Sequence, residues 1–239
     1  MRFAVISDLH ANLEATQAVL ADIRRRDATR IYCLGDLVNY GPNPAGVVDL
    51  IRSEGIPCVM GNHDWSLGNA LDVKDVPTAP GRDVELEHAS YAWTAARLAD
   101  DHRAFLRQLP HLRREQVAKN TVTLVHATPA SLTEYVRPGS STEEWEALLK
   151  EAAGHVVFLG HTHLPFVEWQ SGVLVCNAGS VGRPKDGNPA ASYALAEVDA
   201  EMGVDLIRVE YDVKATAEKI RRSGLPPRLA DSLLAAGNL

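Results

Sequence analysis

The chain has 239 residues, of which 46% are hydrophobic and 23% are charged, a normal balance for a globular protein with one sizeable core. The net charge of −7 argues against broad binding to nucleic acid or to anionic membranes. No apolar stretch approaches the ~18 residues that a membrane helix needs, and the few residues before Asp8 leave no room for a signal peptide.

The first third of the chain predicts strands that alternate with helices. Strands are expected at residues 3–6, 31–34 and 56–60, with helices at about 12–26 and 44–53. Asn43 is a suitable N-cap for the second helix, because Pro44 then occupies its first position. Residues 66–84 lack periodicity and contain Pro77, Pro80 and Gly81, so a loop is expected there.

The rest of the chain predicts more strands than helices. One or two helices are expected over 85–109, a short strand at 112–115 and another at 121–125. Ser141 and Glu144 form a capping-box pattern that starts a helix to about residue 153. Strands are expected near 156–160, 165–169, 173–176, 192–198 and 205–212, followed by a short helical tail at about 214–239.

The three cysteines lie in apolar runs and show no CxxC spacing. They are Cys33, Cys58 and Cys176. This pattern indicates buried thiols in a reducing compartment, so a cytoplasmic location is expected.

Five short polar motifs each follow an apolar run that is typical of a buried strand. They are Asp8-Leu9-His10, Gly35-Asp36, Gly61-Asn62-His63-Asp64, His126, and Gly160-His161-Thr162-His163. In open α/β sheets, ligands bind beyond the carboxyl ends of the strands. The motifs are therefore expected to converge on one site.

Seven side chains in these motifs are carboxylates, carboxamides or imidazoles, the ligand types of hard or borderline cations. They are Asp8, His10, Asp36, Asn62, His126, His161 and His163. Seven ligands are too many for one ion and suit two ions that share a carboxylate, as in enzymes that displace a group at phosphorus. The ligands in two motifs are two residues apart, so an extended backbone would point both the same way.

In this order, the motifs resemble those of the calcineurin-like metallophosphoesterases, especially the compact bacterial phosphodiesterases and small-molecule phosphatases. The resemblance implies an α/β fold, a four-layer α-β-β-α sandwich of two mixed sheets flanked by helices. We expect one domain over 1–239, with the helices near 85–109 as an insertion. The resemblance also implies hydrolysis of a small phosphodiester or phosphomonoester by a metal-bridging hydroxide.

The resemblance also divides the ligands between two divalent ions. Asp8, His10 and His163 resemble ligands of the first ion, and Asn62, His126 and His161 resemble ligands of the second. Asp36 resembles the carboxylate that bridges both. Manganese suits this ligand set, and iron, zinc or nickel are alternatives.

Four further residues are candidates for catalysis or substrate binding. The resemblance implies that His63 contacts the phosphate and protonates the leaving oxygen. Asp64 either orients His63 or caps the next segment. Asn12 either contacts the phosphate or caps the helix after it. Arg183, in a glycine-containing loop after a predicted strand, is a candidate anion contact. Tyr40 and Tyr135 are expected in solvated loops, and the alternative is that they line a pocket.

One departure from the pattern bears on the substrate. Protein Ser/Thr phosphatases of this superfamily carry an Asp that orients the catalytic His and an Arg that binds phosphate, where this chain has Asn39 and Tyr40. A small phosphate ester is therefore the expected substrate. The alternatives are a non-catalytic protein-binding scaffold of the same fold, and a nuclease or dinucleoside polyphosphate hydrolase. The oligomeric state is left open.

Overall fold

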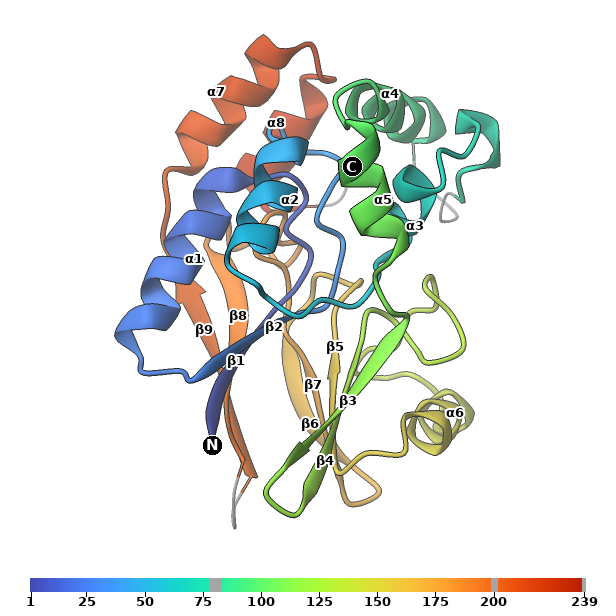
Figure 1. Ribbon diagram of the computed structural model, residues 1–239, viewed down its shortest axis with the longest axis vertical. Coiled ribbons are helices and arrows are strands. Elements are labelled where there is room, and N and C mark those ends of the chain that lie inside the picture. Colours follow the sequence, from blue (N-terminus) through green and yellow to red (C-terminus); the bar gives the residue numbers. More distant parts are fainter. Residues whose placement is uncertain (78–82, 199–201, 238–239) are drawn as a thin grey trace.

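The computed structural model describes residues 1–77, 83–198 and 202–237, and it contains two mixed sheets between layers of helices (Figure 1). The first sheet has the order β2-β1-β8-β9. Its strands are β1 (Arg2–Ile6), β2 (Arg30–Cys33), β8 (Ala191–Val198) and β9 (Met202–Val209). β1 and β2 are parallel, and β8 pairs antiparallel with β1 and with β9.

The second sheet has the order β3-β4-β5-β7-β6. Its strands are β3 (Leu112–Val117), β4 (Asn120–Val125), β5 (Val156–Leu159), β6 (Phe166–Gln170) and β7 (Val173–Asn177). The central strands β4, β5 and β7 are parallel, and the two edge strands pair antiparallel with them. The predicted α/β class with two mixed sheets is confirmed.

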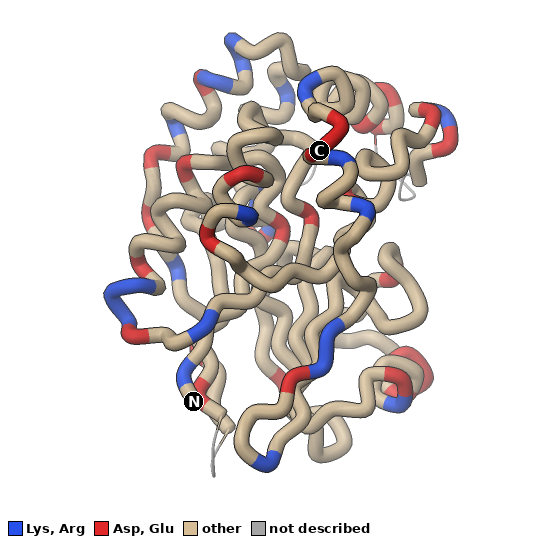
Figure 2. The backbone as a smooth tube through the Cα atoms, in the orientation of Figure 1, with Lys and Arg blue, Asp and Glu red and all other residues tan. Residues whose placement is uncertain are grey.

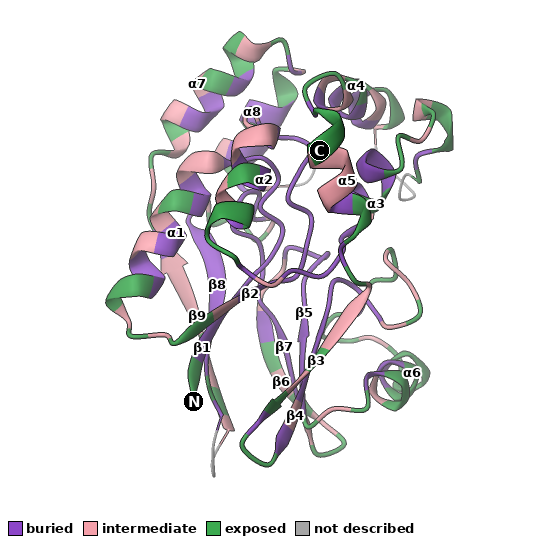
Figure 3. Ribbon diagram, viewed as in Figure 1, coloured by how far each residue is buried: buried purple, intermediate pink, exposed green. Residues whose placement is uncertain are grey.

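The central strands β1, β4, β5 and β7 are buried on both faces, because their alternate residues enter different cores (Figure 3). Phe3 of β1 and Phe158 of β5 meet between the sheets, with ring centroids 5.8 Å apart. Ile6 points instead to the core under the helices, and Leu159 to the core under α6. This double burial is why these strands read as continuous apolar runs.

Helices cover both outer faces of the sandwich (Figure 1). α1 (Leu13–Arg25) and α2 (Pro44–Ser53) contribute to the core on the outer face of the first sheet, and α6 (Thr142–Ala152) covers the second. The predicted capping box of α6 is present, since Ser141 Oγ accepts from Glu144 N and Ser141 N donates to the Glu144 carboxylate. Asn43 stands at the N-cap of α2, but its side chain makes no capping hydrogen bond.

Two predictions between residues 56 and 84 were wrong: a strand at 56–60, and a loop without helices over 66–84. Residues 56–60 form only an isolated bridge, between Cys33 and Cys58, and no strand. Asn62 begins a helix, α3 (Asn62–Gly68), and a short 3₁₀ turn, η1 (Val73–Asp75), follows. A seven-residue helix spans two turns, too few to show a 3.6-residue period. Residues 78–82 of the predicted loop lie outside the described residues.

The helices expected over 85–109 are α4 (Val84–Ala95) and α5 (Asp100–Arg107), and the tail forms α7 (Val213–Ser223) and α8 (Arg228–Ala235). The tail packs against α4: Leu229 and Leu233 share a cluster with Leu86, and Arg228 forms an ion pair with Asp83. Residues 238 and 239 of the predicted tail lie outside the described part of the chain. Within that part, no helix is long and apolar enough to span a membrane.

Candidate metal centre

The loops that carry the motifs are joined to one another by backbone hydrogen bonds. Asp8 N donates to Gly35 O at 3.0 Å, and His10 N donates to Asp36 O at 2.9 Å. Gly160 N donates to His126 O at 2.8 Å. These bonds join the carboxyl end of β1 to that of β2 and the carboxyl end of β4 to that of β5, and His161 N, which donates to Asp8 Oδ2 at 3.0 Å, links the two pairs. The predicted convergence of the motifs is confirmed.

The paired ligands do not leave their strands in extended conformation, as the spacing had suggested. Asp8 and His10 have φ of 54° and 45°, and His161 and His163 have φ of 62° and 61°. Non-glycine residues rarely adopt this left-handed region, and such residues gather at functional sites. The turn places the side chain of His161 beside Asp36 and His126, and that of His163 beside Asp8 and His10.

Two motif glycines allow the loops to come this close. A Cβ on Gly35 would lie 2.3 Å from the backbone nitrogen of Gly61, and Gly35 also has φ of +90°. A Cβ on Gly160 would lie 1.9 Å from Ser7 Oγ and 2.6 Å from Asp8 Oδ2. Because neither site has room for one carbon atom, glycine is required at both.

The ligand side chains form two buried clusters. Asp8, His10 and His163 make up the first, and Asp36, His126 and His161 make up the second. Within each cluster, the candidate ligand atoms all lie within 4.8 Å of one another. Asn62, at the start of α3, adjoins the second cluster, with Oδ1 3.1 Å from His126 Nε2.

Asp36, a member of the second cluster, also faces the first cluster. Its Oδ2 is 3.4 Å from His126 Nε2 and 3.8 Å from His10 Nε2, while its Oδ1 accepts from the backbone of His63. One oxygen thus faces a member of each cluster.

Backbone carbonyls fix the tautomers of all four histidines. The Nδ1 atoms of His10, His126 and His163 lie 3.2, 2.8 and 2.5 Å from backbone oxygens, and His161 Nε2 lies 3.2 Å from Thr133 O. A carbonyl only accepts, so the nitrogen that bonds it carries the proton. In the neutral ring the other nitrogen then has a free lone pair, as a metal ligand needs.

These lone pairs face other acceptors. His10 Nε2 and His163 Nε2 are 3.1 Å apart, and His163 Nε2 is 3.1 Å from Asp8 Oδ1. Asp8 Oδ1 is buried and has no hydrogen-bond partner, whereas its Oδ2 accepts from Ser7 Oγ and His161 N. Acceptors arranged in this way repel each other unless a positive charge lies among them. The residues therefore fit a divalent cation.

The pKa values of His126 and Asp8 agree with this demand for positive charge, whereas His161 remains neutral. Burial disfavours charged His126, but Asp36 outweighs it and raises the pKa of His126 to about 9. Burial lowers the pKa of His161 to about 3, so this ring is neutral near pH 7. The carboxyl of Asp8 has its pKa lowered by His163 and His10 in spite of burial.

Asp64 caps backbone groups and does not contact His63 through its carboxylate. It accepts from Asp36 N at 2.7 Å, Leu37 N at 2.9 Å and Gly61 N at 3.1 Å. Burial and the nearby Asp36 raise its pKa to about 7 despite these bonds. Of the two predicted alternatives, the structure shows the cap.

His63 is the second residue of α3, and not part of an extended segment as the sequence had suggested. Its ring lies 5.5 Å from that of His10, and burial lowers its pKa to about 4. The side chain that contacts its Nδ1, at 3.0 Å, is Asn39. The sequence offered one indication of this contact, because Asn39 occupies the place of the Asp that orients the matching histidine in protein phosphatases of the superfamily.

Asn12 serves as the N-cap of α1. Its Oδ1 accepts from Ala15 N, and its Nδ2 donates to Gly182 O and Tyr211 Oη. The capping alternative is thus observed, and a phosphate contact stays a prediction.

Arg183 is buried, with its guanidinium 4.1 Å from the centre of the Tyr40 ring. Tyr40 is also buried and lines a pocket, so the pocket alternative is observed and the expectation of a solvated loop is wrong for this residue.

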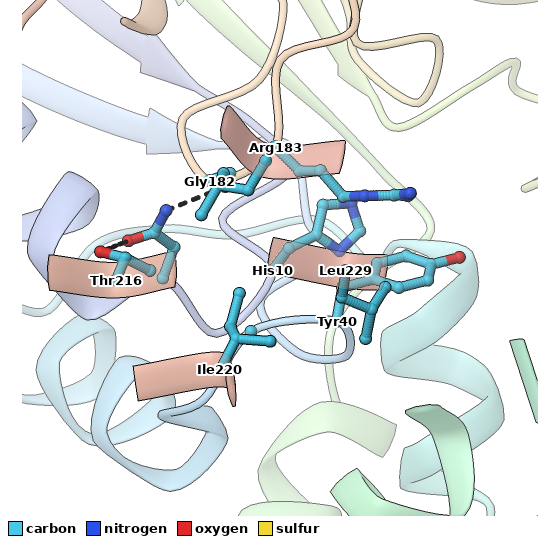
Figure 4. A pocket seen from close by; sticks show the side chains of 10 residues that line it. His10, Tyr40, Gly182, Arg183, Thr216, Ile220 and Leu229 are labelled. Carbon is cyan, nitrogen blue, oxygen red and sulfur yellow. Dashed lines mark hydrogen bonds between the residues drawn. The ribbon is translucent and has the colours of Figure 1, made fainter. Parts of the chain in front are cut away.

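The tail closes the site on this side. Ile220, Leu229 and Leu233 face His10, Tyr40 and Arg183 across a narrow pocket with room for about one water molecule (Figure 4). Sequence reasoning found no role for the tail, because its residues there are apolar and carry no motif.

An exposed aromatic ring lies beside His161 of the second cluster. Tyr135 is 37% exposed and its ring lies 4.4 Å from that of His161, and Trp65, two residues after His63, is 39% exposed.

Comparison with known proteins agrees with this geometry. Residues 1–201 match the model of the calcineurin-like phosphoesterase superfamily domain. The chain belongs to this family. It is 35% identical to the uncharacterised protein MJ0912 of Methanocaldococcus jannaschii, over 96% of both chains. It is 28% identical to the phosphodiesterase YfcE of Escherichia coli, over 83% of this chain and 89% of that one.

A solved metallophosphoesterase from Sphaerobacter thermophilus is also similar. It shares 33% identity, covers 99% of both chains and superimposes with a TM-score of 0.78. The chain is therefore a metallophosphoesterase, a hydrolase of phosphoric esters. The family match ends at residue 201, before the tail helices that close the pocket.

Proposed function

We propose that this protein hydrolyses a small phosphodiester or phosphomonoester with two bound divalent ions. The observation that carries the proposal is the pair of buried clusters, each with lone pairs directed inward, on either side of Asp36. Asp8, His10 and His163 would hold one ion, and Asn62, His126 and His161 the other, with Asp36 shared. When bound, the ions would lower the pKa of water and neutralise charge on the phosphoryl oxygens.

The remaining side chains bind and orient the ester. His63 faces the site and donates a hydrogen bond to the phosphate or its leaving oxygen. Arg183 is the nearby cation for an anionic substrate group, held against Tyr40. Asp64 and the carbonyls behind the histidines keep the loops in place. Manganese is the proposed metal, since the ligands are oxygen and nitrogen.

Several observations favour a small ester over the alternatives. Asn39 and Tyr40 replace the Asp and Arg of the protein phosphatases. In Figure 2, basic and acidic residues are scattered over the described chain and no basic stripe runs across this view, which disfavours a nuclease. The complete ligand set disfavours a non-catalytic scaffold. We propose one domain over 1–239. We also propose a cytoplasmic location, because the three cysteines are buried free thiols.

A substrate panel tests the proposal. Manganese-loaded protein is given bis-p-nitrophenyl phosphate, p-nitrophenyl phosphate, 2′,3′-cyclic nucleotides, a dinucleoside polyphosphate and a phosphoserine peptide. The small esters should turn over, and the peptide should react far more slowly. Faster hydrolysis of the peptide would contradict the substrate class, and no turnover by fully loaded protein would contradict the function.

A further inference from the structure

Asn39 links helix α4 to the imidazole of His63. Its Oδ1 accepts from its neighbour Tyr40 N at 2.9 Å and from Ser90 Oγ, on α4, at 2.7 Å. A backbone N–H only donates, so the amide oxygen must face Tyr40. The amide nitrogen then faces His63 Nδ1, 3.0 Å away.

This orientation decides the tautomer of His63. The amide nitrogen of Asn39 carries two donors and no acceptor, so His63 Nδ1 must accept. The single ring proton therefore sits on Nε2. Asn39 and Ser90 are at most 1% exposed, and Ser90 Oγ also lies 3.1 Å from Tyr40 N, so the surrounding structure holds the amide in place.

We infer that Asn39 is a positioning residue for His63. It holds the imidazole so that Nε2–H donates a hydrogen bond to the substrate and does not transfer its proton. Loss of the Nε2 proton would leave an imidazolate unless Nδ1 gained one, and Asn39 offers no acceptor for an Nδ1–H. The inference rests on the proposed function and narrows its substrate class. The preferred substrates are phosphoesters whose leaving group departs readily as an anion, such as aryl diesters.

The hydrolytic step balances without proton transfer from His63. The oxygen of water forms the new bond to phosphorus and one proton of that water passes to solvent. The bond between phosphorus and the leaving oxygen breaks, and the leaving oxygen keeps the electron pair. His63 Nε2–H stabilises the negative charge by a hydrogen bond alone. An alkoxide would depart slowly under these conditions, whereas a phenolate or a phosphate would depart readily.

Nitrogen-15 NMR of the imidazole reads the tautomer directly. The zinc-loaded protein is compared with Asn39→Asp, a variant of the same shape whose carboxylate can still accept from Tyr40 N and Ser90 Oγ. His63 Nδ1 should show the shift of a nitrogen with a lone pair in the natural protein, and of a protonated nitrogen in Asn39→Asp. The His63 signals are assigned by their loss in His63→Gln. Asn43→Asp, the same change four residues along the chain, should leave them unmoved. A protonated Nδ1 in the natural protein would overturn the inference.

Turnover across leaving groups tests the chemical consequence. In a series of phosphodiesters with leaving groups of rising pKa, kcat of the natural protein should fall steeply. His63→Ala should lower kcat by a constant factor, about 10- to 150-fold for a hydrogen bond to a charged group. A loss that grows with leaving-group pKa would make His63 a proton donor and refute the inference. If fully loaded protein hydrolysed none of the esters, the proposed function and the leaving-group preference would both fail, while the NMR result would still decide the tautomer.

Discussion

The four histidines of the metal centre owe their tautomers to backbone carbonyls, and not to carboxylates that a single substitution could remove. Leu34 O and Val38 O, which face His126 and His10, lie in the loop that also carries Asp36. The conformation of that loop therefore sets the positions of the Asp36 carboxylate and two of the imidazoles together. Asp36 is the side chain of this loop that we propose as the shared ligand of both ions.

Asp36→Asn should weaken both metal sites, because the amide keeps the shape and removes the negative charge between the ions. The loss of affinity should exceed the roughly 10–100-fold that removal of an outer hydrogen-bond partner costs. Elemental analysis after dialysis against dilute manganese measures it, with the exposed Asp75→Asn as the matched control. Two ions retained at normal affinity would contradict the bridging role.

Asp22, at the end of α1, gives a prediction for stability against pH. Burial opposes its charge, but hydrogen bonds from Arg26 and Tyr193 outweigh burial and lower its pKa. A lowered folded pKa stabilises the protein above the unfolded value of about 3.9, and this stability is lost as pH falls through the folded value.

Asp22→Asn should therefore lower the free energy of unfolding by about 1–3 kcal/mol at pH 7. The difference from the natural protein should shrink as the pH falls below about 4. Urea unfolding at neutral and acidic pH checks both statements. Equal stability at pH 7, or a difference that grows on acidification, would show that the network does not stabilise the charged form.

At the scale of elements, strands with a functional loop at the carboxyl end were predictable, because double burial leaves a continuous apolar run. The α3 helix was not, since its seven residues mix ligands with polar and apolar side chains. The packing of α7 and α8 beside Arg183 was also missed. Amphipathic tail helices show that one face is buried but give no sign of which surface they cover.

A substitution at Gly160, in the turn after β5, tests how closely this turn packs against Ser7 and Asp8 at the end of β1. Gly160→Ala should displace Ser7 or the Asp8 carboxylate, because the new Cβ would overlap both. Affinity for the ion at the first cluster should fall more than at the second, by competition with a chelator of known affinity. Gly203→Ala in β9 is the control, since its Cβ would meet nothing within 4 Å. Unchanged metal affinity in Gly160→Ala would contradict the fitted geometry.

At the scale of the whole molecule, the motif order was enough to predict the sandwich and the membership of both clusters. The backbone between the motifs was not predictable. Left-handed turns at His161 and His163, the capping role of Asp64 and the contact of Asn39 with His63 depend on how loops from several strands meet. Such contacts are long-range, and a single sequence records the residues without recording their partners.

The central claim is that two ions on the shared clusters drive phosphoester hydrolysis. The most direct measurement is turnover of bis-p-nitrophenyl phosphate during titration of the chelator-stripped protein with manganese, with bound metal determined on the same samples. The account predicts no activity in the stripped protein and a rise that reaches its plateau at two bound ions per chain. Full activity at one bound ion, or none at two, would contradict it.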